Sequence, residues 1–155
     1  QLDGSGSYIH SEYSDELLQD PTGLATLNIG GNQLIRAPEW KLNFGAQFET
    51  EVADLGTFLL RGESSYTSEV FHDVFNGKAP FQAGTAEDDY WISNARLIWR
   101  PNDDRFELQL FVENIGDEMY AYSRVASATT ASVTGQFSPP RTFGARLSMK
   151  FGSAR

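Results

Sequence analysis

Several segments of this chain alternate apolar and polar residues at every second position. The clearest covers residues 40–49, and its even positions are all apolar: Trp40, Leu42, Phe44, Ala46 and Phe48. The odd positions carry lysine, asparagine, glycine, glutamine and glutamate. A β-strand places such residues on one face, whereas a helix would scatter them around its axis. The pattern therefore predicts strands with one apolar and one polar face.

Further alternating segments cover residues 55–70, 90–100, 106–113 and 141–151, and residues 2–14 form a weaker, more polar strand candidate. Their apolar positions on the same face as Trp40 are Phe58, Leu60, Tyr66, Trp91, Ala95, Leu97, Trp99, Phe106, Leu108, Leu110, Val112, Phe143, Ala145, Leu147, Met149 and Phe151. The sequence thus predicts about six antiparallel strands and an all-β fold.

The connections between these strands alternate strictly between long and short. Residues 15–37, 71–88 and 116–140 are long connections, whereas residues 52–54 and 101–104 are short ones. A β-sandwich has no reason to show this regularity. A transmembrane barrel does, because its periplasmic turns are short and its extracellular loops are long. We therefore expect an antiparallel up-and-down transmembrane β-barrel segment whose last strand ends on the periplasmic side.

Aromatic residues gather at both ends of the apolar face. Phe48, Phe58, Trp99, Phe106 and Phe151 lie beside the short turns, and Trp40, Tyr66, Trp91 and Phe143 lie beside the long loops. Aromatic side chains favour the two membrane–water interfaces, so these nine are candidate membrane-interface residues. Charged residues such as Arg61, Glu63 and Arg96 occupy the opposite face, which suits a wet lumen better than a dry core.

Composition narrows the function. No apolar run approaches the roughly 18 residues of a membrane-spanning helix, which leaves spanning strands open. The formal charge of -9 disfavours a nucleic-acid partner, and the absence of cysteine removes thiolate chemistry. The two histidines, His10 and His72, lack metal-ligand spacing, and no nucleophile elbow or phosphate-binding loop is present. We therefore expect no catalytic site, metal or cofactor.

Residues 111–120 (FVENIGDEMY) and 140–144 (PRTFG) carry a family resemblance. The first contains Asn114, Asp117 and Tyr120, and the second contains Pro140, Arg141 and Gly144. With the alternation that runs down to Phe151, these stretches resemble the last two strands of the TonB-dependent outer-membrane receptors. Residues 31–34 (GNQL) and 37–38 (AP), which precede the strand from residue 40, also fit.

The resemblance implies a 22-stranded barrel with a plugged lumen in the Gram-negative outer membrane. Such a receptor imports a scarce ligand, a siderophore complex or cobalamin, with energy that the TonB complex delivers through the plug. Its implied partners are outer-membrane lipid, the remainder of the barrel and plug, and the barrel-assembly machinery. Two other readings of the residues remain open: a passive outer-membrane channel, and a soluble β-sandwich binding module with one solvated sheet face.

Six strands cannot close a barrel of that size, and unpaired strand edges in lipid are costly. We therefore expect residues 1–151 to be the C-terminal part of a barrel that continues in the same polypeptide or in a complementary chain. Residues 152–155, which follow Phe151, are expected to be a natural extension or a cloning scar. Ligand contacts are expected from the loops 15–37, 71–88 and 116–140. Asn114 and Asp117 are expected to bind nearby backbone where the strand leaves the sheet.

Overall fold

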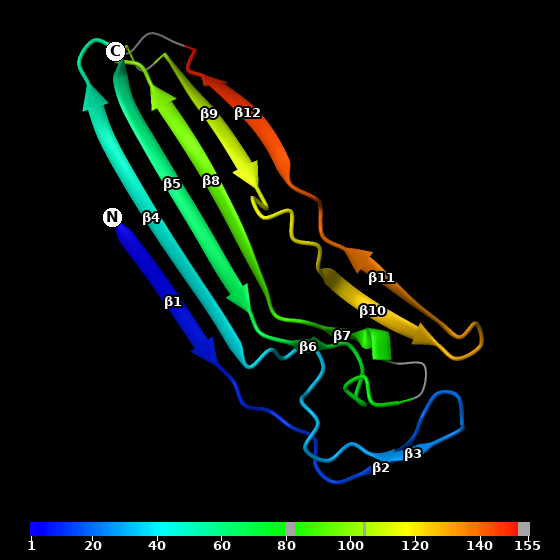
Figure 1. Cartoon of the computed structure of the whole chain (residues 1–155). Coiled ribbons are helices and arrows are strands. Elements are labelled where there is room, and N and C mark those ends of the chain that lie inside the picture. The colour runs from blue at the N-terminus through cyan, green and yellow to red at the C-terminus, as the bar shows by residue number, and fades with distance from the viewer. Residues whose placement is uncertain (80–82, 104, 152–155) are drawn as a thin grey trace.

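A computed structural model describes residues 1–79, 83–103 and 105–151; the extension expected at residues 152–155 lies outside them. Its main feature is a curved six-stranded antiparallel sheet in the order β1-β4-β5-β8-β9-β12 (Figure 1). The strands are β1 (Leu2–Tyr8), β4 (Trp40–Val52), β5 (Gly56–Thr67), β8 (Tyr90–Arg100), β9 (Phe106–Glu113) and β12 (Thr142–Met149). Each of these six strands pairs with the next of the six along the chain. The predicted all-β, up-and-down arrangement of six strands is therefore confirmed.

The register aligns the apolar positions of neighbouring strands. One row crosses five strands through Phe48, Leu60, Leu97, Leu110 and Ala145. Directly paired residues point to the same side of a sheet. The apolar positions predicted from the sequence therefore form one continuous face, which leaves large side chains such as Phe48 (66% exposed) uncovered. Leu59, the exception to the alternation, is buried on the polar face, where it pairs in register with Ile98.

The turn between β4 and β5 needs left-handed backbone at two positions. Asp54 has a φ of 65° and Gly56 a φ of 98°. Aspartate tolerates this region better than most residues, and glycine adopts it without a steric penalty. A Cβ on Gly56 would also lie 2.0 Å from the Arg100 carbonyl oxygen. Asp54 and Gly56 thus fix this connection as a tight hairpin.

The three long connections contain short strands of their own, which the sequence patterns did not predict. Loop 15–37 contains the hairpin β2 (Leu17–Gln19) and β3 (Thr26–Asn28). Around loop 71–88, β6 (Val70–Phe71) pairs with β7 (Ala86–Glu87), and a 3-10 turn, η1 (Ala83–Thr85), precedes β7. Loop 116–140 contains β10 (Ala121–Ser127) and β11 (Ser132–Phe137), which continue β9 and β12 beyond the sheet (Figure 1). The first strand is also shorter than the expected 2–14, because pairing with β4 ends at Tyr8.

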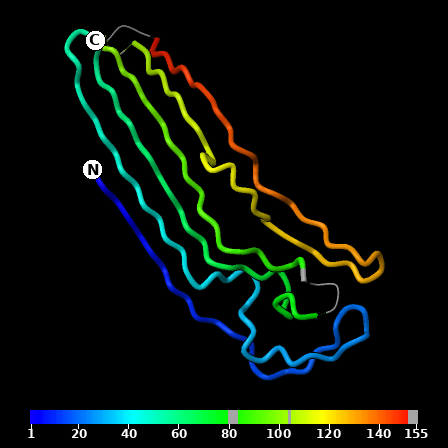
Figure 2. The backbone as a smooth tube through the Cα atoms, viewed as in Figure 1, coloured from blue at the N-terminus to red at the C-terminus, as the bar shows by residue number. Residues whose placement is uncertain are grey.

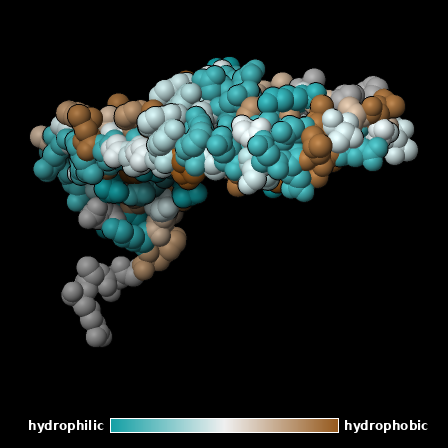
Figure 3. All heavy atoms as spheres, turned by 90° about the horizontal axis from the view of Figure 1, so that it is seen from below, coloured by the Kyte–Doolittle hydropathy of each residue, from teal (hydrophilic) through white to brown (hydrophobic). Residues whose placement is uncertain are grey.

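The long connections gather at one end of the sheet, opposite the short turns (Figure 2). Ile29, Phe75 and Ala79 form a small buried cluster there, with Tyr13, Leu18, Leu27 and Val74 packed against it. Seen from this end, the surface is mostly hydrophilic, with apolar side chains scattered over it (Figure 3). The described part of the chain contains no helix long and apolar enough to cross a membrane.

Candidate functional site

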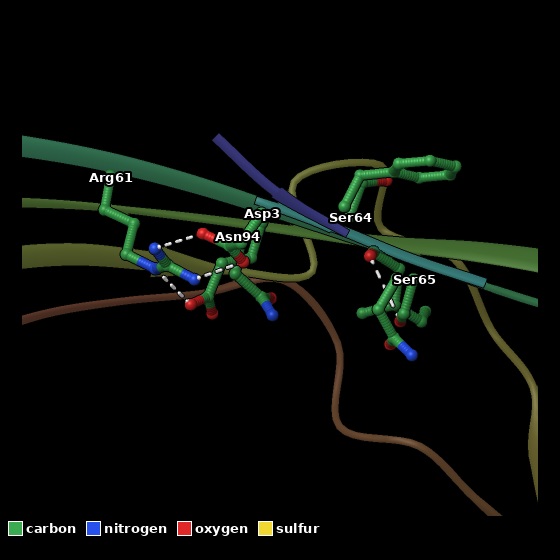
Figure 4. A pocket seen from close by; sticks show the side chains of 9 residues that line it. Asp3, Arg61, Ser64, Ser65 and Asn94 are labelled. Carbon is green, nitrogen blue, oxygen red and sulfur yellow. Dashed lines mark hydrogen bonds and ion pairs between the residues drawn. The ribbon is translucent and has the colours of Figure 1, made fainter. Parts of the chain in front are cut away.

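The polar face carries an ion-pair network centred on Arg61 of β5. Its guanidinium donates two hydrogen bonds to Asp3 of β1, at 2.9 and 3.0 Å, and a third to Glu63 at 2.5 Å. Arg61 and Asp3 reach each other across β4 in Figure 4. Arg96 of β8 approaches Glu63 at 3.7 Å. Paired side chains thus link β1, β5 and β8, and span β4, in a wall that is charged but internally compensated.

Gly45 of β4 makes the Arg61–Asp3 contact possible. A Cβ at Gly45 would lie 2.4 Å from Asp3 Oδ2 and 2.8 Å from Arg61 Nη2. Beside the pair is a hollow of about 330 Å³ that Asn43, Ser65 and Asn94 help to line (Figure 4). We call the hollow the wall pocket; it offers hydrogen bonds with little net charge.

The Asn114 side chain stabilises the backbone at the end of β9, where the chain leaves the sheet. Asn114 is 6% exposed and has a φ of 54°. Its amide nitrogen donates to the Glu118 carbonyl at 2.8 Å and to the Pro139 carbonyl at 3.3 Å. Its amide oxygen accepts from the Glu118 backbone nitrogen at 2.9 Å. Asn114 therefore satisfies backbone groups on both sides of the third connection, the β10–β11 segment.

Asp117 and Arg141 connect the end of β9 to the segment that precedes β12. The Arg141 backbone nitrogen donates to Asp117 Oδ1 at 2.8 Å, and its guanidinium donates to the Ile115 carbonyl at 3.1 Å. Gly144 lies next to Phe111 in register, and a Cβ at Gly144 would lie 2.2 Å from the Phe111 ring. The structure thus brings Asn114, Asp117 and Arg141 together at one strand junction.

A second hollow lies where the three long connections meet the polar wall. We call it the loop-root pocket; its volume is about 170 Å³. Its lining residues come from all three connections and the strand ends beside them: Arg36, Pro38, Lys41, Thr67, Val70, His72, Glu87, Tyr90, Tyr120, Ala121 and Tyr122. No short stretch of sequence contains this set, so the pocket exists only because the fold assembles it.

Three tyrosines form one side of the loop-root pocket. Tyr120 stacks on Tyr90 with ring centroids 4.3 Å apart and planes 14° apart. Tyr122 meets Tyr120 edge-on at 5.2 Å. Burial raises the pKa of the Tyr120 hydroxyl, and its hydrogen bond with Tyr122 raises it further. Tyr120 therefore stays neutral at physiological pH and keeps its hydroxyl proton.

Basic side chains form the other side of the pocket. Arg36 and Lys41 are exposed, and neither forms a salt bridge within the residues that the structure describes. Both ring nitrogens of His72 are buried without a hydrogen-bond partner in the same set of residues. Burial lowers the pKa of His72, and nearby Arg36 lowers it further, so the ring is neutral near pH 7. The pocket thus combines aromatic faces with two cations that form no salt bridge among the described residues.

Sequence patterns predicted only part of this pocket. Tyr120 was a motif residue, and the connections were named as the source of ligand contacts. Arg36 and His72 gave no such indication, because their neighbours in the pocket are distant in sequence. One pattern was visible: Tyr120, Tyr122 and Arg124 alternate through the third connection, as residues on one strand would.

The candidate interface aromatics occupy the two ends of the apolar face. At the short-turn end, Trp99 stacks on Phe58 at 6.1 Å and meets Phe106 edge-on at 5.4 Å. At the other end, Trp91 contacts Tyr66 at 5.1 Å. Trp40, Phe48, Phe143 and Phe151 are exposed. In the described ranges, no three His, Cys, Asp or Glu side chains are placed to hold a metal ion.

Comparison with known proteins identifies a family and two solved structures that resemble this chain. A family described as TonB dependent receptor-like, beta-barrel matches residues 1–115, a range that ends before most of the motif around Asp117 and Gly144. No curated protein matches the chain. The ferric yersiniabactin uptake receptor FyuA from Yersinia pestis has a similar structure, with a TM-score of 0.68 and 17% identity over 80% of this chain.

BauA, the ferric preacinetobactin receptor from Acinetobacter baumannii, matches with a TM-score of 0.52 and 17% identity over 77% of this chain. At this identity the likeness concerns the fold. The chain spans 18% of the length of FyuA and 16% of that of BauA. Since the family match covers residues 1–115, this chain belongs to the TonB-dependent receptor β-barrel family.

Proposed function

We propose that this chain is the C-terminal barrel part of an outer-membrane receptor that imports a scarce ligand, such as a siderophore complex or cobalamin, with TonB-dependent energy coupling. Receptors of this family are outer-membrane proteins of Gram-negative bacteria. The single observation that carries the proposal is the loop-root pocket, which lies where the outer loops meet the polar wall. In this orientation, a ligand that enters from outside passes the loops and reaches the pocket at the mouth of the barrel wall.

In this proposal the apolar face contacts lipid, and the bands around Trp99 and Trp91 lie at the two interfaces. The polar wall, with its compensated Arg61 network, lines the lumen and faces the plug. Residues 1–151 supply six strands, and the edges of β1 and β12 pair with the remainder of the barrel. The barrel-assembly machinery inserts the complete barrel into the outer membrane.

The proposal is tested by measuring uptake of radiolabelled cobalamin and of radiolabelled iron bound to a panel of siderophores. Cells that produce the receptor should accumulate one of these ligands, and cells that lack the receptor or TonB should not. Uptake that persists without TonB would instead identify a passive channel.

Point variants then test the pocket. Tyr122→Ala should reduce uptake at an unchanged amount of receptor in the membrane, because it removes an aromatic face of the loop-root pocket. The control is Val125→Ala on the same hairpin, at a side chain that is 62% exposed and lies outside the pocket lining. Equal uptake by the two variants would remove the pocket from the proposal.

A further inference from the structure

The second and third connections meet at an ion pair whose carboxylate is buried and whose arginine is partly buried. Arg124 of β10 approaches Glu87 of β7, with 2.5 Å between Nη2 and Oε2. The side chain of Glu87 is 8% exposed and that of Arg124 is 25% exposed. Arg124 Nη1 also donates to the Gly84 carbonyl at 3.0 Å, and the guanidinium lies 5.9 Å from the Phe137 ring centroid. One arginine thus contacts two segments of the neighbouring connection.

Each residue of this pair is close in sequence to the loop-root pocket. Glu87 itself lines the pocket, and its partner in register, Val70, lies two residues before His72. Arg124 lies two residues after Tyr122 on the same strand. The ion pair therefore joins the segment that carries His72 to the segment that carries Tyr120 and Tyr122.

A close backbone approach accompanies the ion pair. A Cβ built on Gly84 would lie 3.6 Å from the Val133 Cβ, so η1 packs directly on β11. The first connection is attached to the second by Asn32, whose amide nitrogen donates to the Val74 carbonyl at 2.9 Å and whose amide oxygen accepts from Lys78 at 2.7 Å. The third connection contacts the second through Arg124 and Val133, and its other end is held by the stacking of Tyr120 on Tyr90 of β8.

We propose that the Glu87–Arg124 pair is a latch that positions the tyrosine side of the loop-root pocket against its basic side. Arg124 and Glu87 act as positioning residues: the latch orders β10, and β10 sets where Tyr120 and Tyr122 stand relative to His72. Removing one partner of a buried pair leaves the other charge uncompensated, so the two connections separate instead of relaxing in place. The role of the pocket in ligand capture rests on the proposed function; the latch does not.

The test is hydrogen exchange, followed by mass spectrometry, of the complete receptor in lipid vesicles without ligand. Glu87→Gln should speed exchange by about tenfold or more in residues 119–126 and in residues 70–75, because both segments lose their shared anchor. Asp88→Asn is the matched control: it removes the same charge one residue away, at an exposed side chain with no salt bridge in the described ranges. It should leave exchange unchanged.

A disulfide provides the rescue. The 3.6 Å spacing of the Gly84 and Val133 Cβ positions matches disulfide geometry, and these 155 residues contain no cysteine. In the Glu87→Gln background, Gly84→Cys with Val133→Cys should restore slow exchange after oxidation and lose it again after reduction. Arg124→Lys should retain part of the protection, since lysine keeps the charge but cannot also reach Gly84.

Unchanged exchange in Glu87→Gln, an equal rise in Asp88→Asn, or no recovery on oxidation would each overturn the latch. These outcomes are independent of transport, since no ligand is present. TonB-independent uptake would defeat the proposed function while leaving the latch intact.

Discussion

At the scale of single residues, the two histidines have opposite surroundings. His10 Nδ1 donates a hydrogen bond at 3.0 Å to the Glu39 carboxylate, whereas both His72 ring nitrogens are buried without a partner in the described part of the chain. The hydrogen bond with Glu39 raises the pKa of His10, and nearby Glu12 adds to this effect. Burial lowers the pKa of His72. Identical side chains thus acquire different protonation behaviour from their neighbours.

A histidine titration should therefore show two separated midpoints. NMR of the imidazole Cε1 protons should place the midpoint of His10 above 6.5 and that of His72 below it, with His72→Gln removing the lower one. The stabilisation from His10 is complete below pH 6.5 and fades as the pH rises through its raised pKa. The contribution of His72 is present above pH 6.5 and is lost as the pH falls through its lowered pKa. A shared midpoint would contradict these environments.

At the scale of elements, the alternation along each strand determines which face a substitution reaches. Leu110 of β9 lies in the apolar row with Leu97 and Ala145, whereas Gln109 pairs with Ile98 and Arg146 on the polar face. The face that each strand position occupies was therefore readable from residue parity alone. The internal strands β10 and β11 were not, because AYSRVAS and SVTGQF lack a clean apolar face. Their pairing also depends on tertiary contacts such as Arg124 with Glu87.

Arginine substitutions at adjacent positions of β9 test the two faces. Leu110→Arg should destabilise the barrel by about 2–4 kcal/mol if that face lies in the bilayer, because a charge at the midplane loses its hydration. Gln109→Arg should change the stability little, because Gln109 lies on the polar face of the sheet. Urea unfolding of the complete receptor in lipid vesicles measures both. Equal losses of stability for the two variants would show that the faces are assigned wrongly.

At the scale of the whole molecule, the sheet and the outer connections differ in how far sequence determines them. The sheet follows from a period of two that each strand carries by itself. The loop-root pocket does not, because Arg36, His72 and Tyr120 come from three connections that only tertiary packing unites. Motif recognition found Asn114 and Asp117, whose hydrogen-bond partners lie in the strand junction and not in the pocket.

The uncovered apolar face predicts the behaviour of the chain in solution. Phe143 is 72% exposed, Phe48 66% and Leu147 54%, and they share one continuous surface. The 155-residue chain should therefore self-associate in aqueous buffer and disperse in detergent, because detergent tails cover that surface as lipid would. Analytical ultracentrifugation with and without detergent measures this. A monomer that unfolds cooperatively in buffer alone would instead support a soluble β-sandwich module.

The small cluster of Ile29, Phe75 and Ala79 takes all its members from the first two connections and none from the six long strands. Its packing is thus separate from the uncovered apolar face of the sheet. Residues of this cluster can therefore change together without a change in the sheet, whereas Lys41, Thr67 and Tyr90 link the loop-root pocket to it. In protein engineering, this cluster is therefore a part of the molecule to vary while the six-stranded sheet is kept.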